Sequence, residues 1–417
     1  MPVRIDSIPP LAMRPHPPRP WRWLAGLVIS LLMGFLVTLM FADEPLRQDG
    51  QRFWWQALML PLFLWCASFV LRYLVHIGGV SVADGWDRAR EADLLARLRR
   101  GRRSHRILAV SLHTALRGPA DSTGQEQSEA LAGDQSALRT QPLWDSPSQS
   151  CRHSELSFDL GLQEGELDHE VLLAQVYRRV LVDLADTVLT LPAEQPMALV
   201  LDIDSQVTAQ RTLALWHEAW VEQGLRQELP LFEHQGFPAV DHWLDSRRRD
   251  SSLLLVVSAR IAPSPADETA EVAVCLLLGD RGAPSPLPPL AYLHRPEQES
   301  GGTTDSLRRA ILRALEWVPL DADAIGDSWL ADICDSRHGD VSRAFLELLV
   351  PLQLGQGMHD LKASLGACGP AAPWVAIAAC AERARSRQRP QLIVSGGDVE
   401  AALWCSVVTP VAMFESE

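Results

Sequence analysis

Several sequence motifs that are typical of common enzymatic and binding activities are missing from this chain of 417 residues. It has no GxGxxG, no P-loop and no CxxC pair, so it lacks the usual signatures of dinucleotide binding, phosphate binding and paired-cysteine chemistry. The chain also has no excess of positive charge: its formal net charge is -14 at pH 7. A nucleic-acid-binding protein needs a basic face, and this balance argues against that class.

Cysteine is sparse and has no spacing typical of a disulfide framework. The seven cysteines are scattered, and most lie in apolar stretches: Cys66, Cys151, Cys275, Cys334, Cys368, Cys380 and Cys405. We therefore expect reduced, buried thiols that pack as small hydrophobic groups in a reducing compartment.

Two long apolar runs are present near the N-terminus. Leu24 to Phe41 is almost unbroken, and Phe53 to Leu71 has only Gln56 and Ser68 as polar residues. Tryptophans and Tyr73 flank these runs, as is typical of membrane interfaces, and no small-residue cleavage site follows the first run. The sequence predicts a transmembrane hairpin at residues 21–80 in place of two buried core helices, preceded by a disordered, Pro-rich and basic segment at residues 1–20.

Arginine distribution predicts the orientation of this hairpin. Arg14, Arg19 and Arg22 precede the first run, many arginines follow the second run, and the short link has only Arg47 and Arg52 beside three acids. Both termini should therefore be cytoplasmic and the link periplasmic or extracellular, in a protein with two spans; the resemblance given below implies that the membrane is a bacterial inner membrane. Residues 81–106 should form a basic juxtamembrane helix, whose arginines either contact anionic lipid headgroups or form an ordinary solvated helix end.

The remainder of the chain alternates strand-like and helix-like stretches, which indicates an α/β fold. Expected strands include 107–116, 197–203, 252–259, 271–278, 391–395 and 401–408, and expected helices include 167–190, 208–222, 237–245, 306–317, 342–352 and 374–384. We expect Asp204 or Ser205 to cap the second of these helices and Asp305 to open the fourth. A Pro/Gly/Ser-rich connection at 282–302 should separate two halves, 107–282 and 303–417.

The most informative stretch is Lys362 to Trp374, which reads KASLGACGPAAPW. Its small residues allow another backbone to approach closely, and Pro370 and Pro373 suit the first turn of a helix. The helix that follows leads to a strand, the Gly396-Gly397 pair and a second strand. A helix followed by two strands also occurs at the end of other α/β domains, so this order alone does not identify a family.

Those motifs resemble the C-terminal end of ketosynthases in the thiolase-like superfamily. That family carries K-S-x-x-G-H-x-x-A-A-A-G before a small-residue helix and G-G-T-N in the last hairpin, and Lys362, Gly366, Ala371, Ala372 and Gly396-Gly397 match it. The resemblance implies a thiolase-like fold of layered sheets and helices. Glu271 to Leu278 is similar to the family's E-G-A-A-x-L-x-L strand.

The same resemblance implies that the catalytic groups are missing. The family's histidine falls on Ala367, and no cysteine lies at Gly236 to Ala239, where the nucleophile's helix would begin. The nearest thiol, Cys275, is in the middle of a strand. Residues 337–340, Arg-His-Gly-Asp, look like a shortened H-G-T-G-T-x-x-G-D loop, in which His338 and Asp340 are the remaining pieces. Cys368, in the small-residue turn, is the one thiol there that could keep chemistry.

Other candidate sites have weaker patterns. Cys334, His338 and His359 do not have the spacing of a standard metal site. Ser205 lies at a strand-to-helix turn without GxSxG around it and is expected to be a cap, while His113, His217 and His242 have no evident partners. We therefore expect no metal, no cofactor and no catalytic residue.

The overall layout resembles the type VI lipase adapter family of bacterial secretion loci. That resemblance implies a non-catalytic, membrane-anchored adapter or chaperone for a secreted effector, with a lipase or secretion spike protein as partner and a homodimer left open. The alternative is a membrane-associated acyl- or lipid-handling enzyme that uses His338 or Asp340.

Overall fold

A computed structural model describes most of the chain. The described residues are 3, 5, 7–41, 43–44, 49–118, 121, 124–143, 146–156, 168–246, 251–350, 353–354, 357–396 and 402–413. They form two compact units, Arg4–Leu98 and Arg99–Glu417, and the second unit also includes Met1–Val3.

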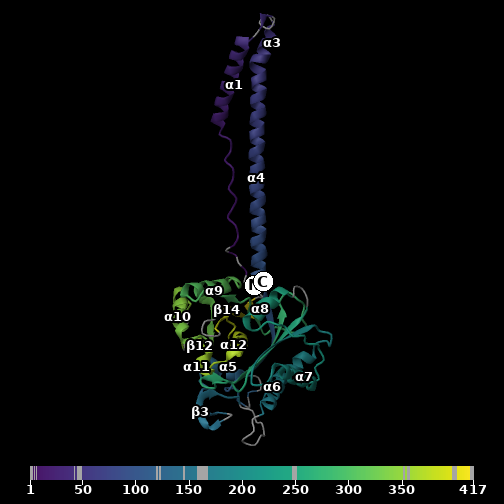
Figure 1. Cartoon of the computed structure of the whole chain (residues 1–417), viewed down its shortest axis with the longest axis vertical. Helices are drawn as coiled ribbons and strands as arrows, with labels where there is room; N and C mark the ends of the chain where they lie inside the picture. Colours follow the sequence, from purple (N-terminus) through teal and green to yellow (C-terminus); the bar gives the residue numbers. More distant parts are fainter. Residues whose placement is uncertain are drawn as a thin grey trace. The chain divides into compact units, whose positions relative to one another are not determined.

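The first unit contains the two apolar helices. Helix α1 covers Pro20–Phe41, and the second helical segment runs through α3 (Gly50–Trp54), a π-helical turn η1 (Trp55–Met59) and α4 (Leu60–Gly101). The last three residues of α4 belong to the second unit. Both segments are long and apolar enough to cross a membrane, and α1 lies beside the early turns of α4 (Figure 1).

Close packing joins α1 to α4. A Cβ on Gly34 would collide with the ring of Pro61, so only glycine fits at this contact. The Ser30 hydroxyl donates to the Pro61 carbonyl at 3.3 Å, and the Trp65 indole donates to the Trp23 carbonyl at 3.1 Å. The π-helical turn η1 ends two residues before Pro61, which cannot donate a backbone hydrogen bond to the preceding turn.

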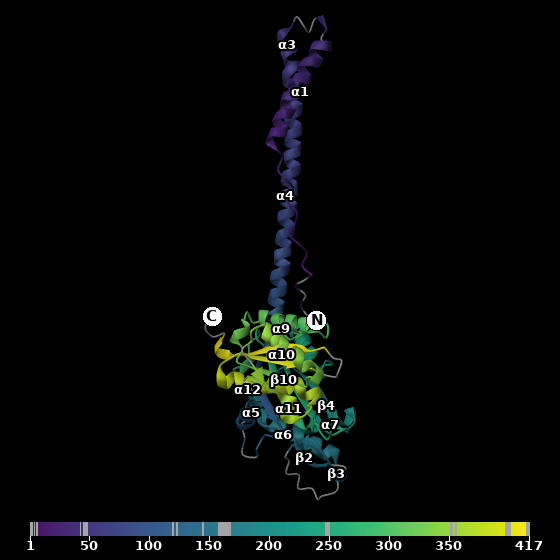
Figure 2. The same cartoon turned by 90° about the vertical axis from the view of Figure 1, so that its left-hand side faces the viewer.

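The basic N-terminal segment, expected to be disordered, forms no helix or strand at residues 8–19 but makes specific contacts with α4 (Figure 2). The Arg90 guanidinium donates to the Pro9 carbonyl at 2.7 Å, and the Ala12 amide donates to Asp87 at 2.9 Å. Arg14 forms an ion pair with Asp84 at 3.2 Å. These contacts hold the segment against one face of α4.

The second unit is built on an 11-stranded sheet in the described residues. Its strand order is β11-β12-β10-β13-β14-β8-β1-β7-β5-β4, with β9 also paired to β14. The strands are β1 (Ser104–His113), β4 (Met197–Asp204), β5 (Leu253–Arg260), β7 (Val272–Asp280), β8 (Ala291–His294), β9 (Glu297–Gln298), β10 (Asp327–Ala331), β11 (Gln353–Leu354), β12 (Gly357–Asp360), β13 (Gln391–Ser395) and β14 (Trp404–Pro410). A small sheet joins β2 (Arg139–Leu143), β3 (Ser146–Ser154) and β6 (Thr269–Ala270).

Helices form layers on both faces of the large sheet. They are α5 (Gln125–Ala132), α6 (His169–Leu189), α7 (Ala209–Glu222), α8 (Gly236–Ser246), α9 (Thr304–Glu316), α10 (His338–Glu347), α11 (Leu361–Leu365) and α12 (Ala372–Arg387). Single 3-10 turns are η2 (Ala322–Ala324), η3 (Asp335–Arg337), η4 (Gly369–Ala371) and η5 (Val411–Met413). One core joins α6 and α7 to the sheet, another joins α9 and α10 to it, and α8 and α12 lie in the central core between these layers (Figure 1).

Helix α12 is the centre of the unit, as the sequence indicated. Every residue from Ala372 to Ala381 is buried, and strands of both halves contact this helix, including β7 and β1 from one half and β13 and β14 from the other. The halves share one continuous sheet because β8, which lies inside the connection expected at 282–302, pairs with both β1 and β14. Strand β8 has only four residues, which is too short for its hydrophobic pattern to predict a strand.

Helix starts differ from several expectations. Thr208, not Asp204 or Ser205, is at the N-cap of α7, and the Ser205 hydroxyl instead accepts from the Val207 amide at 3.3 Å. Thr303 caps α9 and forms a capping box with Ser306, so Asp305 lies within the first turn. Helix α10 begins at His338, four residues earlier than expected.

Candidate functional site

The two central helices, α8 and α12, begin close to one another and share a buried carboxylate. Asp202, near the end of β4, accepts a hydrogen bond from the Trp374 indole at 3.2 Å and another from the Gly236 amide. Burial raises the pKa of Asp202, and these two donors oppose that effect. Asp202 therefore satisfies polar groups at the first turns of both helices.

A second buried carboxylate caps the small-residue turn before α12. Asp332 follows β10 with a left-handed φ of 46° and accepts from the amides of Cys368 at 3.0 Å and Gly369 at 2.6 Å. Burial raises the pKa of Asp332, although its two amide donors and the charges of Arg260 and Lys362 act against this. A helix N-terminus carries unpaired amides that favour an anion, and here the protein's own carboxylates bind to them.

The glycine expected to allow a close backbone approach does so. Gly366 has a φ of 102°, and a Cβ there would come within 2.6 Å of the Thr269 backbone. Ala367 donates its amide to the Glu268 carbonyl at 2.8 Å, and its own carbonyl accepts from the Ala270 amide at 2.9 Å. The position where the family would carry histidine is thus tied by its backbone to the β6 segment.

The Arg-His-Gly-Asp stretch is divided between two environments. Arg337 makes a bidentate ion pair with the fully buried Glu299, at 3.0 and 2.9 Å, and a third contact with Asp340 at 2.8 Å. Asp340 also accepts from the Thr304 hydroxyl at 2.6 Å. These groups join α10 to the start of α9, so Asp340 has a structural role.

His338 and Lys362 face a neighbouring, partly exposed group of acids. The His338 ring lies 3.6 Å from Asp360, and the amine of Lys362, the only lysine in the chain, lies 3.1 Å from Asp335. Partial burial disfavours the charge of Lys362, but its bond to Asp335 raises the pKa overall. Lys362 is thus neutralised by Asp335, and His338 has Asp360 as its partner.

Five of the seven cysteines lie in the strands, helices and turns around the candidate site, and they differ in burial. Cys275, Cys368, Cys380 and Cys405 are fully buried, and burial raises the pKa of each thiol. Cys334 is partly exposed, and a hydrogen bond with Ser336 lowers its pKa. Thiolates, not thiols, are the nucleophiles, so the buried group, Cys368 included, should be unreactive in the folded protein.

The three residues considered as metal ligands have separate partners. His359 lies between Asp134 at 3.0 Å and Asp327 at 3.6 Å, while His338 faces Asp360 and Cys334 faces Ser336. Among the residues that the structure describes, no group of three or more His, Cys, Asp or Glu side chains could hold a metal ion.

The remaining histidines are structural or on the surface. His113 is buried and lies 3.0 Å from Asp183, which also binds Arg117 at 2.7 Å. His242 stacks on His234 with ring centroids 3.9 Å apart, and His217 is exposed.

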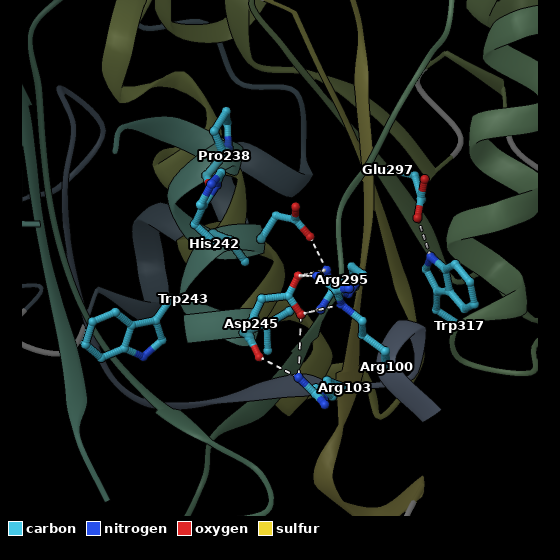
Figure 3. A network of polar contacts seen from close by, with 12 residues as sticks. Arg100, Arg103, Pro238, His242, Trp243, Asp245, Arg295, Glu297 and Trp317 are labelled. Carbon is cyan, nitrogen blue, oxygen red and sulfur yellow. Dashed lines mark hydrogen bonds and ion pairs between the residues drawn. The ribbon is translucent and has the colours of Figure 1, made fainter. Parts of the chain in front are cut away.

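An ionic network near the end of α4 was missed in the sequence. Asp245 of α8 binds Arg100 at 2.9 Å, Arg103 at 3.5 Å and the fully buried Arg295 at 2.8 Å, and Arg295 also pairs with Asp241 (Figure 3). Burial alone would raise the pKa of Asp245, but Arg100 and Arg295 hold it far below its usual value. Arg100 and Arg295 lie 145 and 50 positions from Asp245, and no motif or spacing in the sequence indicates that they pair with it.

This network also bears on the arginines expected to contact lipid headgroups. Arg100 and Arg103 bind α8. Arg97 follows Leu71, the end of the second apolar run, by 26 residues of continuous helix, which is about 39 Å along the helix axis. The Arg97 guanidinium contacts the Ser7 hydroxyl and lies 3.0 Å from Asp93. The contact of the other arginines of this helix with lipid headgroups stays a prediction.

Comparison with known proteins identifies the fold. No protein-family model and no curated protein matches the chain. Among solved structures, the ishigamide ketosynthase/chain length factor matches with a TM-score of 0.55 and 12% identity, over 74% of this chain and 99% of that one. The PfaC keto synthase-chain length factor matches with a TM-score of 0.52 and 11% identity, over 74% of this chain and 43% of that one.

A beta-ketoacyl synthase from Burkholderia phymatum STM815 matches with a TM-score of 0.50 and 14% identity, over 74% of this chain and all of that one. This chain spans less than half the length of the PfaC chain. Identities this low show the fold alone, and the fold is thiolase-like, a mixed α/β arrangement of layered sheets and helices.

Proposed function

We propose that this protein is a non-catalytic, membrane-anchored adapter or chaperone for a secreted effector, similar in role to the type VI lipase adapters. In this proposal the two apolar helices anchor the chain in a bacterial inner membrane with both termini in the cytoplasm. The thiolase-like unit would then bind the effector, a lipase, or the spike protein that carries it. A rigid sheet with a wide surface suits binding even when no chemistry remains.

One observation carries the non-catalytic part of the proposal. The amides at the start of α8 and of η4, which leads into α12, already bind Asp202 and Asp332. An acyl-transfer enzyme stabilises a developing oxyanion with such donors. With these carboxyl groups in place, the donors are already bound and are not free to stabilise an oxyanion.

The residues around these helix starts agree with that interpretation. Gly236 to Ala239 supplies no thiol, and Ala367 can neither accept nor donate a proton with its side chain. Phe237 and Trp374 are 2% and 0% exposed, so large side chains fill the space between the two helix starts. Cys368 is buried with a raised pKa.

The alternative, an acyl- or lipid-handling enzyme, depends on His338 or Asp340. Asp340 is held by Arg337 and Thr304, which leaves His338 beside Asp360 as the remaining candidate. A histidine–aspartate pair without a reactive nucleophile nearby supports an acid–base role at most, so we rank the adapter first.

Acylation of the full-length, detergent-solubilised protein tests the non-catalytic part. The protein is incubated with a thioester acyl donor and its mass is measured, intact and after digestion. We expect no acylation of Cys275, Cys368 or Cys380 in the folded protein and rapid acylation after denaturation. Fast, stoichiometric acylation of Cys368 that disappears in Cys368→Ser would overturn the proposal and favour the enzyme.

Partner binding tests the adapter part separately. Proteins that co-purify with the tagged chain from detergent extracts are identified by mass spectrometry, with an unrelated two-span membrane protein as control. Specific enrichment of a lipase or a secretion spike protein is expected. Enrichment of fatty-acid or polyketide enzymes alone would contradict the adapter.

A further inference from the structure

Helix α4 has two different faces after its apolar run. Gly79, Ala83, Asp87 and Arg90 lie on the face that the N-terminal segment covers, where Ala83 is only 4% exposed. The other face has no partner within the described residues of this unit. Its composition is unlike that of a solvated helix surface.

The uncovered face carries an apolar heptad pattern over Val75–Ala96. Val75, Val82, Ala89 and Ala96 recur every seven residues, and Gly78, Gly85 and Ala92 recur every seven residues between them. In a heptad these are the a and d positions. All seven are exposed, with Val75 at 61% and Val82 at 74%. We call these seven residues the α4 seam.

Nothing in the described part of the single chain requires glycine at two positions of the α4 seam. Gly79, outside the seam, is required because a Cβ there would lie 2.9 Å from Pro15. Gly78 and Gly85 have nothing within 4 Å of a Cβ. Each glycine in a helix interior costs about 1 kcal/mol relative to alanine, and a helix that packs closely against the seam would offset this cost.

Charges beside the seam indicate which partner this is. In this register, Arg88 occupies the g position of one heptad and Asp93 the e position of the next, five residues later. In a parallel pair of helices, g of one chain faces this e of the other. Arg88 is exposed and forms no ion pair among the described residues, and Asp93 is half exposed beside Arg97. Two copies in parallel would therefore form two Arg88–Asp93 pairs.

We propose that two copies of this chain associate through the α4 seam as a parallel, two-stranded coiled coil. Valine occupies two of the four a positions, and glycine or alanine occupies every d position, which allows two helices to approach closely. The parallel direction also rests on the proposed anchor, since two chains inserted alike present α4 in the same direction. A two-fold axis makes the seam self-complementary.

Disulfide trapping in the full-length protein tests the seam. The background is Cys66→Ser, Cys151→Ser and Cys334→Ser, which removes the exposed or partly exposed thiols. Val82→Cys should form a disulfide-linked dimer on mild oxidation in membranes. Glu91→Cys, exposed and on the outer c position, is the matched control and should remain monomeric.

A charge exchange tests the register. Arg88→Asp should weaken dimerisation in detergent about tenfold by native mass spectrometry, and adding Asp93→Arg should restore it. A monomer at all concentrations would overturn the proposal, as would equal cross-linking at positions 82 and 91. A dimer without cross-linking at position 82 would also overturn it, because the contact would then lie elsewhere.

These outcomes are separable from failure of the anchor. If alkaline extraction releases the protein from membranes, the proposed anchor is wrong. The difference between positions 82 and 91 still reports on the seam, because it can be measured on the released protein.

Discussion

The indole ring of Trp317 lies directly over Gly101. A Cβ on Gly101 would collide with the six-membered part of the ring, and Trp317 itself is 1% exposed. The Trp317 N–H donates to Glu297 at 2.6 Å (Figure 3). Gly101, the last residue of α4, and Trp317, the residue after α9, therefore pack as one unit with a buried carboxylate.

Gly101→Ala should destabilise the protein even though alanine is the better helix former. The added methyl group has to displace the Trp317 ring and thereby weaken its bond to Glu297, at a cost of roughly 1–3 kcal/mol. The measurement is the apparent melting temperature in detergent. Gly339→Ala, in α10 with nothing within 4 Å of a Cβ, is the control and should be neutral or slightly stabilising; equal behaviour of the two variants would contradict this account.

Asp245→Ala should be among the most destabilising single changes in the second unit. It removes a partner of the fully buried Arg295 and of two further arginines, and loss of one partner of a buried ion pair costs about 3–5 kcal/mol. Thermal unfolding checks this. Asp305→Ala, which removes an exposed acid 3.7 Å from Arg308, should shift unfolding little, and a similar shift for both would show that the network contributes nothing special.

Stability should depend on pH through Glu271. Its carboxyl group accepts from the Ala262 amide at 2.8 Å and the Leu156 amide at 3.1 Å, yet burial raises its pKa to about 8. The folded protein thus keeps a proton that the unfolded chain loses above pH 4.5. The free energy of unfolding should therefore fall as the pH rises from about 4.5 to about 8, by at most about 1.4 kcal/mol per pH unit, and level off above.

Glu271→Gln should remove the part of this slope that Glu271 contributes, because glutamine has no proton to lose. Melting temperatures across this pH range measure the slope. Glu268→Gln is the matched control, since Glu268 is half exposed, and it should leave the slope unchanged. An unaltered slope in Glu271→Gln would assign the dependence to other groups.

Ala376→Leu or Ala379→Leu should overpack the centre of the second unit. Both alanines are 0% exposed within α12, and inserting extra methylene groups into a filled core costs roughly 1–3 kcal/mol. Arg385→Leu, on the exposed part of the same helix, should have little effect. Thermal unfolding of the three variants side by side distinguishes core packing from a general effect of leucine in α12.

Membrane topology is tested with a reporter that is active only outside the cytoplasm. Fused after Glu417 it should be silent, and inserted at Gln48 in the link it should be active, because arginines concentrate on both outer flanks of the two apolar helices. The reverse pattern would exclude a cytoplasmic thiolase-like unit.

Much of the fold followed from local patterns. The buried strands β5, β7 and β13 are unbroken apolar runs, and α6 begins after Asp168, whose side chain accepts from the Glu170 amide at 2.9 Å as expected of a cap. The small residues of Lys362 to Trp374 correctly indicated close backbone approach at Gly366. A single sequence therefore predicts best those elements that have a regular hydrophobic pattern or that require a particular residue for steric reasons.

The candidate site was less predictable, because its groups meet only after folding. Asp202 lies two residues before the end of β4, and Asp332 directly follows β10. The Trp374 indole lies 172 positions from Asp202, and the Cys368 and Gly369 amides lie 36 and 37 positions from Asp332. The sequence presented Asp340 as a piece of a shortened motif, whereas its contacts, which join α10 to α9, involve Thr304 and, through Arg337, Glu299. Composition and spacing carry no information about such long-range polar pairing.

If the protein is a non-catalytic adapter, as proposed, the carboxyl groups at the two helix starts also limit any route back to catalysis. A mutant with a cysteine near Ala239 and a histidine at Ala367 would regain the missing functional groups but not a working active site. Asp202 and Asp332 would still hold the amides that an oxyanion needs. Replacing either aspartate would leave hydrogen-bond donors without an acceptor and would therefore destabilise the fold. Reversion thus requires several changes that are each harmful alone, which makes the proposed loss of activity evolutionarily difficult to reverse.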